Sequence, residues 1–193
     1  NAGSVVITLT AQPLSPCAVA ATDQMTLTIQ RLATAFAGND ATICENGTRT
    51  LNGSATRYSS TLWTTSGSGA FSNPALLNPV YTPSNADKTA GTIVLTLTAQ
   101  PISPCSVSAS DQMVLTIQQL STANAGIDAT ICENSTHSLN GSAVRYSSVL
   151  WSTSGTGTFS NSSILNPVYT PSTADKNAGS VVITLTAQPL SPC

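Results

Sequence analysis

The chain has 193 residues, and only 7% of them are charged, against about 25% in an average soluble protein. A net charge of −2 provides no basic patch for nucleic acid, and a single histidine with eight scattered carboxylates offers little to acid–base catalysis. No apolar run approaches the roughly 18 residues of a membrane span, so we expect neither an enzyme, a nucleic-acid-binding protein nor a membrane-spanning segment.

The sequence repeats itself with a period of 88 residues. Residues 34–105 and 122–193 align without a gap and are identical at 53 of 72 positions, and residues 1–17 match residues 177–193 at every position. This phasing predicts that residues 1–33 are the C-terminal part of a first module, residues 34–121 a complete module, and residues 122–193 a second module that lacks its last strand. We expect the chain to be a window on a longer tandem array.

Each module is expected to be all-β. A short first strand ends at Cys44, and an Asn-Gly pair at 52–53 bends the strand that follows. The third strand carries Trp63, and Met113, Leu115 and Ile117 lie on one face of the last strand. The remaining strands are expected at 70–72, 80–84 and 93–100, with a single helical turn possible at 84–91. About seven short strands with turn signals every 8–12 residues predict a β-sandwich.

Trp63 and Trp151 are the only indoles of their modules and are expected to anchor the two cores, together with Phe71 and Phe159. A tryptophan on the third strand that faces the opposite sheet is typical of such sandwiches. The further side chains expected to be buried are Leu62, Ile43, Leu51, Val94, Leu115, Leu150, Ile131, Leu139 and Val182.

The shared frame of the modules reads DATICEN, LNGSA, LW-[ST]-TSG, LNPVYTPS, ADK and LTLTAQ. This frame resembles the immunoglobulin-like or PKD-like tandem repeats of giant surface proteins of the Bacteroidota, many of the gliding-motility-adhesin type exported by the type IX secretion system. The resemblance covers the whole chain, period by period. It implies immunoglobulin-like sandwiches stacked in an elongated rod, and a non-enzymatic, extracellular stalk whose partners are neighbouring modules and, beyond them, surface glycans or other cells.

A second function stays open beside the stalk, namely a self-assembling filament subunit. Residues 18–30 form a last strand without its own sandwich, and this strand could fill the gap in the second module of a neighbouring chain by β-strand addition. Residues 1–17, however, duplicate a strand that the second module already has, which favours the excerpted tandem array.

Candidate site residues are few. We expect no catalytic residue and no metal site, and His137 is expected to be a solvated strand residue. Asp40 and Asp128 are weak calcium candidates, because calcium takes six to eight oxygen ligands and no acidic cluster is present; a turn role is favoured for them. Asp87 and Asp175 are expected to cap free N–H groups of the ADK corner.

An Arg-Tyr pair is repeated between the second and third strands, and both copies are weak ligand candidates. A carbohydrate could bind such a pair, but packing of the arginine over the ring is favoured. The four residues are Arg57, Tyr58, Arg145 and Tyr146.

Five cysteines in a Ser/Thr-rich, exported chain are expected to be oxidised. Within modules, Cys44–Cys105 and Cys132–Cys193 could pair and leave Cys17 for an upstream partner; between modules, Cys44 could pair with Cys193. In an immunoglobulin-like topology the first strand ends at the pole that faces the next module, which brings Cys44 nearer to Cys193. The usual preference of small domains for internal bonds opposes this, so both pairings stay open.

Overall fold

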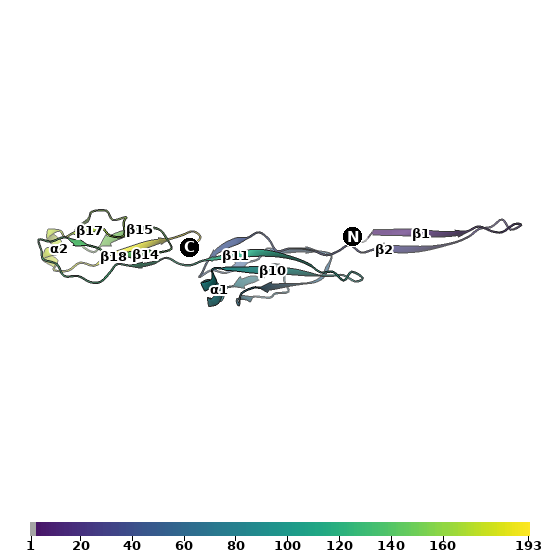
Figure 1. Ribbon diagram of the computed structural model, residues 1–193, viewed down its shortest axis with the longest axis horizontal. Coiled ribbons are helices and arrows are strands. Elements are labelled where there is room, and N and C mark those ends of the chain that lie inside the picture. The colour runs from purple at the N-terminus through teal and green to yellow at the C-terminus, as the bar shows by residue number, and fades with distance from the viewer. Residues whose placement is uncertain (1–2) are drawn as a thin grey trace. The chain divides into compact units, whose positions relative to one another are not determined.

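The computed structural model describes residues 3–193 and groups them into two compact units (Figure 1). The first unit contains the residues up to Ala41 together with Thr48–Asp87 and Thr92–Leu115, and the second contains Thr42–Gly47, Lys88–Gly91 and Thr116–Cys193. Strands account for 48% of the residues and helices for 6%, which confirms the all-β prediction.

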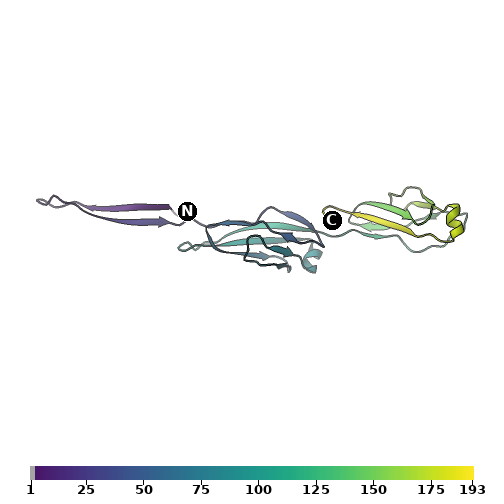
Figure 2. The same ribbon diagram turned by 180° about the vertical axis from the view of Figure 1, so that it is seen from behind.

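The first unit begins with an antiparallel hairpin of two strands, β1 (Gly3–Ala11) and β2 (Ala21–Ile29). These strands lie side by side in Figures 1 and 2, and every residue in both is exposed. Their side chains include Leu9, 72% exposed, and Met25, 57% exposed. The corresponding segments 88 positions later, Thr92–Pro101 and Ala109–Gln118, form the last two long strands of residues 34–121.

Residues 34–121, called the complete repeat from here on, form a β-sandwich. One layer has the strand order β4-β11-β10-β7. The facing layer is made by the pair β3-β6 and the three-stranded sheet β5-β9-β8, and the short helix α1 precedes β10. The bounds are β3 (Thr34–Phe36), β4 (Ala41–Cys44), β5 (Arg49–Thr50), β6 (Ser54–Thr56), β7 (Tyr58–Thr65), β8 (Ala70–Phe71), β9 (Val80–Thr82), α1 (Asn85–Ala90), β10 (Thr92–Pro101) and β11 (Ala109–Gln118).

The core follows the two-residue period of the strands. Along β10 every second side chain is buried, from Ile93 to Ala99, and along β11 the buried side chains are Met113, Leu115 and Ile117, as expected from their spacing. The indole of Trp63, 1% exposed, packs 6.3 Å from the ring of Phe71 between centroids.

Three side chains expected in the core of the complete repeat are not fully buried. Phe71 is partly buried and packs against Trp63. Leu62 is 45% exposed and Val94 is only partly buried, and these two share one reason. Successive side chains of a strand point to opposite faces, so Leu62 cannot share the core face with Trp63. Val94 likewise lies between the two inward residues Ile93 and Leu95.

The Asn-Gly bend has a packing reason in the structure. A Cβ atom on Gly53 would lie 2.7 Å from Cζ2 of Trp63 and 2.8 Å from the carbonyl oxygen of Leu77. Only glycine leaves the indole room at this point, and the chain accordingly breaks between β5 and β6. Gly141 lies in the same way against Trp151, with 2.6 Å to Cζ2.

Residues 122–193, called the shortened repeat from here on, form the sheets β15-β18, β13-β17-β16 and β12-β14. Figures 1 and 2 show β15 (green) beside β18 (yellow), with α2 at the end of the unit. The bounds are β12 (Thr122–Asn124), β13 (His137–Ser138), β14 (Ser142–Val144), β15 (Tyr146–Thr153), β16 (Thr158–Phe159), β17 (Val168–Thr170), α2 (Thr173–Ala178) and β18 (Ile183–Pro189).

The core of the shortened repeat is smaller than expected. Trp151, Leu139, Val149, Tyr169 and Leu185 form it, and Phe159 packs against it.

Three side chains expected in the core of the shortened repeat are exposed. Leu150 (49% exposed) and Val182 (67%) lie on the outer face of their segments, next to inward residues, as Leu62 and Val94 do. Ile131 (39%) is exposed for another reason: its counterpart Ile43 lies on β4, which pairs with β11, and residues 122–193 contain no counterpart of β11.

Candidate functional site

A buried carboxylate organises the same corner in both repeats. In the complete repeat, Asp87 accepts hydrogen bonds from the N–H groups of Ser68 (2.8 Å), Gly69 (2.9 Å) and Ser84 (3.1 Å) and from the hydroxyl of Tyr81 (2.7 Å). The hydroxyl of Ser84 in turn accepts from the N–H of Asp87, at the start of α1. These contacts confirm that Asp87 caps the free N–H groups of the corner.

Asp175 repeats this arrangement in the shortened repeat. Its carboxylate accepts from the N–H groups of Thr156 (2.9 Å) and Ser172 (2.9 Å) and from the hydroxyl of Tyr169 (2.8 Å). Ser172 and Asp175 form a capping box at the start of α2. The corner is therefore a structural latch between a hairpin turn and a helix.

The charge of the latch is stabilised by its hydrogen bonds. Burial alone would raise the pKa of Asp87, but the bonds from Ser68, Tyr81 and Ser84 outweigh burial and hold that pKa below its ordinary value. The N–H groups of Ser172 and Thr156 hold the pKa of Asp175 low in the same way. Burial raises the pKa of the Tyr81 hydroxyl to about 12, so the tyrosine is the neutral donor of the pair.

Both calcium candidates, Asp40 and Asp128, are exposed. Oδ1 of Asp40 accepts a hydrogen bond from the N–H of Val114 at 2.8 Å. Asp40 thus bonds the last strand, far away in sequence, rather than its own turn. Among residues 3–193, no group of three or more His, Cys, Asp or Glu side chains could hold a metal ion. Calcium binding by Asp40 or Asp128 stays a prediction.

Both arginines of the ligand-candidate pairs adopt a left-handed backbone conformation, with φ of 55° at Arg57 and 56° at Arg145. Nη1 of Arg57 donates to the carbonyl of Leu32 at 3.5 Å, and Nε of Arg145 donates to the carbonyl of Leu120 at 3.2 Å. Each guanidinium thereby fastens its loop to the segment that enters the repeat.

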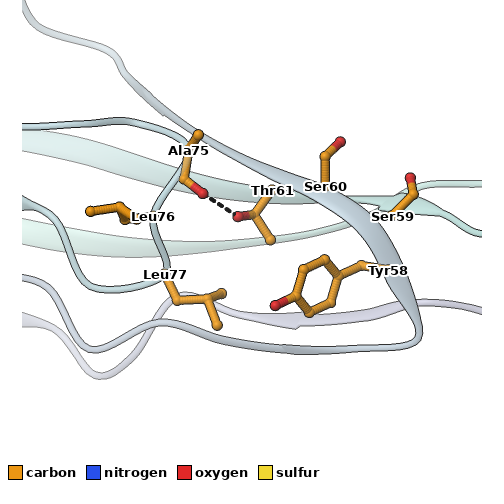
Figure 3. A pocket seen from close by; sticks show the side chains of 7 residues that line it. All are labelled: Tyr58, Ser59, Ser60, Thr61, Ala75, Leu76 and Leu77. Atoms are coloured by element: carbon orange, nitrogen blue, oxygen red, sulfur yellow. Dashed lines mark hydrogen bonds between the residues drawn. The ribbon is translucent and has the colours of Figure 1, made fainter.

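Tyr58 lines a shallow groove of about 420 Å³ beside Leu76 and Leu77 (Figure 3). At its edge, the hydroxyl of Thr61 donates to the carbonyl of Ala75 at 2.8 Å. Serine and threonine hydroxyls, a phenol and leucines line the groove, and no charged side chain does. The groove thus offers uncharged polar groups and apolar side chains, and glycan binding by Arg57, Tyr58 and their counterparts Arg145 and Tyr146 stays a prediction.

A disulfide joins Cys44 to Cys193, with 4.9 Å between the two Cα atoms. Of the two pairings that the sequence leaves open, this is the one between modules. The bonds Cys44–Cys105 and Cys132–Cys193 do not form, and the thiols of Cys17, Cys105 and Cys132 are free. The bond spans 149 positions of the sequence, and both cysteines belong to the second compact unit.

Backbone contacts fix the segment around Cys44 at this bond. The N–H of Glu45 donates to the carbonyl of Gln118 at 2.8 Å, and the N–H of Leu120 donates to Oε1 of Glu45 at 3.1 Å. Sγ of Cys193 lies 3.3 Å from the carbonyl oxygen of Gln118. We call these five residues the junction.

Sequence reasoning missed Glu45, Gln118 and Leu120 as parts of this site. A signal for them exists, because the C-E-N sequence after the first strand and a Gln-x-Leu sequence before each repeat both recur with the period. His137, expected to be a solvated strand residue, lies on β13 opposite Tyr169 and is partly buried.

Comparisons with known proteins give structural likenesses only. No protein-family model and no curated protein matches the chain. Among solved structures, it is similar to extracellular cadherin domains 1–4 of protocadherin gamma B7 (TM-score 0.48, 14% identity, 96% of this chain and 54% of that chain). It is also similar to extracellular cadherin domains 1–5 of protocadherin gamma B2 (TM-score 0.45, 12% identity, 97% and 42%) and to the D00–D0 domain of intimin (TM-score 0.40, 12% identity, 81% and 86%).

The chain spans about half of the length of the protocadherin structures that it matches. At TM-scores below 0.5, these likenesses carry no inference about function. Within residues 3–193, no helix is both long and apolar enough to cross a membrane.

Proposed function

We propose that the chain is part of an extracellular, non-enzymatic stalk built from tandem immunoglobulin-like repeats, which projects or links a binding region at the cell surface. The observation that carries the proposal is the Cys44–Cys193 bond. It ties the first strand of one repeat to the loop before the last strand of the next repeat, so a pull along the chain passes through a covalent link.

Composition and oxidation support an extracellular location for this stalk. Structural disulfides persist in oxidising compartments and are rare in the cytosol. Strands of about 7–9 residues give modules about 30 Å long, and we propose that successive modules stack into a rod. Neighbouring modules are the first partners, and surface glycans or other cells are the partners proposed for the complete fibre.

The finer assignment rests on the sequence frame alone. DATICEN, LNPVYTPS and LTLTAQ lead us to propose membership of the giant Bacteroidota surface proteins of the gliding-motility-adhesin type, exported by the type IX secretion system.

A second candidate function, a filament subunit that polymerises by β-strand addition, is favoured by one observation. The apolar side chains Met25, Leu27 and Ile29 of β2 are 57%, 45% and 53% exposed, whereas the same residue types on β11 are buried. The mass of the native protein on a denaturing gel separates the two functions: hundreds of kilodaltons indicate one long array, and about 20 kDa, close to the 19.7 kDa of this chain, indicates a polymer.

The stalk proposal is tested by pulling a single oxidised chain from its two ends. Force that enters at Cys193 crosses the disulfide to Cys44, so the residues between them stay outside the force path. Reduction should release this segment, whose ends are 149 positions apart, and add about 500 Å of extension when it unfolds, at roughly 3.3–3.6 Å per residue.

The Cys44→Ser variant should show the long extension without reductant, and the Cys105→Ser variant, which lacks a free thiol, should behave as the unaltered chain does. Equal extension of the unaltered chain with and without reductant would contradict a load-bearing junction.

A further inference from the structure

We propose that the segment Gln118–Ser121, which ends β11 and leads to β12, is a noncovalent template for the disulfide between Cys44 and Cys193. The segment brings the two cysteines together before they are oxidised, and Glu45 and Arg145 act on it as positioning residues. The inference deepens the proposed stalk, on which it rests in one respect: the junction is taken as the link between repeats. Every contact that carries the inference lies within the second compact unit.

Glu45 holds the template from the side of the complete repeat. Its N–H donates to the carbonyl of Gln118 at 2.8 Å, and its Oε1 accepts from the N–H of Leu120 at 3.1 Å. One residue thus makes a donor contact and an acceptor contact to backbone groups two positions apart. Because Cys44 directly precedes Glu45, these two bonds also fix where the Cys44 thiol lies beside the segment.

Two contacts hold the same segment from the side of the shortened repeat. Nε of Arg145 donates to the carbonyl of Leu120 at 3.2 Å. The hydroxyl of Ser121 donates to the carbonyl of Ala187 on β18 at 3.0 Å. Since β18 leads directly into the loop that carries Cys193, the template also fixes the strand that delivers the second cysteine.

The carbonyl oxygen of Gln118 is the point where the two sides meet. It accepts from the N–H of Glu45, and Sγ of Cys193 lies 3.3 Å from it. A thiol is a weak hydrogen-bond donor, so the same oxygen can hold the Cys193 side chain in its reduced form. The N–H of Cys193 closes a turn on the carbonyl of Leu190 at 2.9 Å, which gives the loop its own shape. These hydrogen bonds do not depend on the covalent bond between the sulfurs.

The backbone of Arg145 is consistent with a positioning role. Its φ of 56° lies in the left-handed region, which bulky residues rarely adopt and which persists only where surrounding contacts offset its cost. The guanidinium contact to Leu120 is one such contact. Arg57 has nearly the same φ, 55°, but its Nη1 contacts the carbonyl of Leu32 at 3.5 Å, outside the template. Arg57 is therefore a matched control for Arg145.

The bond closes by thiol–disulfide exchange, with glutathione disulfide as the oxidant. The thiolate of Cys44 attacks one sulfur of the glutathione disulfide and releases a glutathione thiolate, which leaves a mixed disulfide on Cys44. The thiolate of Cys193 then attacks the Cys44 sulfur, and the second glutathione thiolate leaves. The two protein thiols give up two electrons and two protons, which the glutathione disulfide takes up as it becomes two thiols. A template favours the second attack, because that step requires the two cysteines to be neighbours.

The test uses a full chain whose only cysteines are Cys44 and Cys193, with the other three replaced (Cys17→Ser, Cys105→Ser, Cys132→Ser). Hydrogen exchange of the Leu120 N–H is followed by NMR in the reduced chain. In parallel, the chain is equilibrated with reduced and oxidised glutathione, quenched with acid and measured by intact mass. The glutathione equilibrium gives the effective concentration of one thiol at the other.

The reduced chain shows whether the template precedes the bond. We expect the N–H of Leu120 to exchange at least about tenfold more slowly than in an unfolded chain, and Glu45→Ala to remove this protection. Exchange of Leu120 at the unfolded rate in the reduced chain would mean that the disulfide creates the contacts, and would overturn the proposal.

The glutathione equilibrium shows what the positioning residues contribute. Glu45→Ala should lower the effective concentration about fivefold, the value of one hydrogen bond, and Glu45→Gln, which keeps an acceptor oxygen, should stay within about twofold. Arg145→Gly keeps the left-handed backbone without the guanidinium and should lower it about threefold, whereas Arg57→Gly should leave it unchanged. Equal effective concentrations in Glu45→Ala and the unaltered chain would overturn the proposal, as would equal losses from the two arginine variants.

A separate readout distinguishes positioning from a contribution to folding. The urea midpoint of the reduced chain, followed by tryptophan fluorescence, should be the same with and without Glu45→Ala, because the contacts lie between repeats and not within either core. A lowered midpoint that accounts for the whole change in the glutathione equilibrium would overturn the positioning role.

Failure here is distinguishable from failure of the stalk, because the stalk is tested on the oxidised Cys44–Cys193 bond of a single chain under load. Shielded extension under load, together with a glutathione equilibrium that Glu45→Ala leaves unchanged, would retain the stalk and reject this inference.

Discussion

The complete and shortened repeats share most of their sequence and differ by the last strand, β11. The part of the module that surrounds the tryptophan is alike in both: Trp63 and Trp151 are 1% and 2% exposed, and Asp87 and Asp175 make corresponding hydrogen bonds. The part that β11 covers differs. Ile43 is 8% exposed on β4, whereas Ile131 is 39% exposed in a segment that forms no strand.

The comparison distinguishes structure that forms without the last strand from structure that requires it. The tryptophan core and the aspartate latch depend on residues of the module's own first part, so they form in both repeats. The first strand depends on β11: the N–H of Val114 donates to Asp40 and the N–H of Ala37 donates to Asp111 (2.8 Å each). The DATIC segment therefore forms the strand β4 in the complete repeat, where β11 is present. In the shortened repeat, the same five residues are exposed and form no strand.

The largest expected effect tests the shared part. Trp63→Ala should lower the free energy of unfolding of the complete repeat by about 3–5 kcal/mol, since a buried indole is lost, and Trp151→Ala should cost the shortened repeat a similar amount. Calorimetry of the two variants measures both. Leu62→Ala is the matched control, at less than about 1 kcal/mol, because its side chain faces outward. If the two tryptophan variants lose different amounts of free energy of unfolding, the two cores are not equivalent.

A smaller effect tests the last strand itself. Leu115→Ala on β11 should cost about 2–5 kcal/mol, whereas Leu27→Ala at the corresponding position of β2 should change stability by no more than about 0.5 kcal/mol. The first side chain is 0% exposed and the second 45%. In a Trp151→Phe background, Trp63 fluorescence during urea denaturation reports the complete repeat alone. A comparable loss from Leu27→Ala would mean that β2 is covered in solution.

The smallest effect concerns the latch and its dependence on pH. Asp87→Asn should cost about 1.5–3 kcal/mol near neutral pH, the value of hydrogen bonds to a charged group. The pKa of Asp87 is lower in the folded than in the unfolded chain, so its contribution is full above about pH 4 and is lost as the pH falls through the folded pKa. Urea midpoints measured from pH 7 to pH 2 should therefore fall less steeply for the variant, and Asp23→Asn, on the exposed β2, should follow the unaltered chain.

Patterns with a period of two allowed much of the fold to be predicted. The burial of Met113, Leu115 and Ile117 follows from their spacing, and the burial of Trp63 from its place on the third strand. The errors at Leu62 and Leu150 came from assigning two neighbours in one strand to the same face. Ile131 could not be placed from its own sequence, because an identical segment is buried or exposed according to whether β11 pairs with it.

The site was predictable in part. The repeated spacing of the cysteines reduced the possible disulfides to two arrangements, one within modules and one between modules. The choice between them depends on which ends of two neighbouring modules meet, and the sequence around Cys44 and Cys193 does not specify this. The backbone groups of Gln118 and Leu120 bind Glu45 irrespective of their side chains, so residue type gave no signal for chemistry at these positions. The short strand β3 was missed because Thr34–Phe36 is too brief to show a period.

The span of the junction also bears on how the number of repeats can change in evolution. Its cysteines lie 149 positions apart while the sequence repeats every 88, so the Cys44–Cys193 bond reaches from one repeat into the next. Unequal recombination that inserts or removes whole periods preserves this spacing at every internal position. In the proposed tandem array, the number of repeats could therefore change in single genetic steps while cysteines 149 positions apart remain in place.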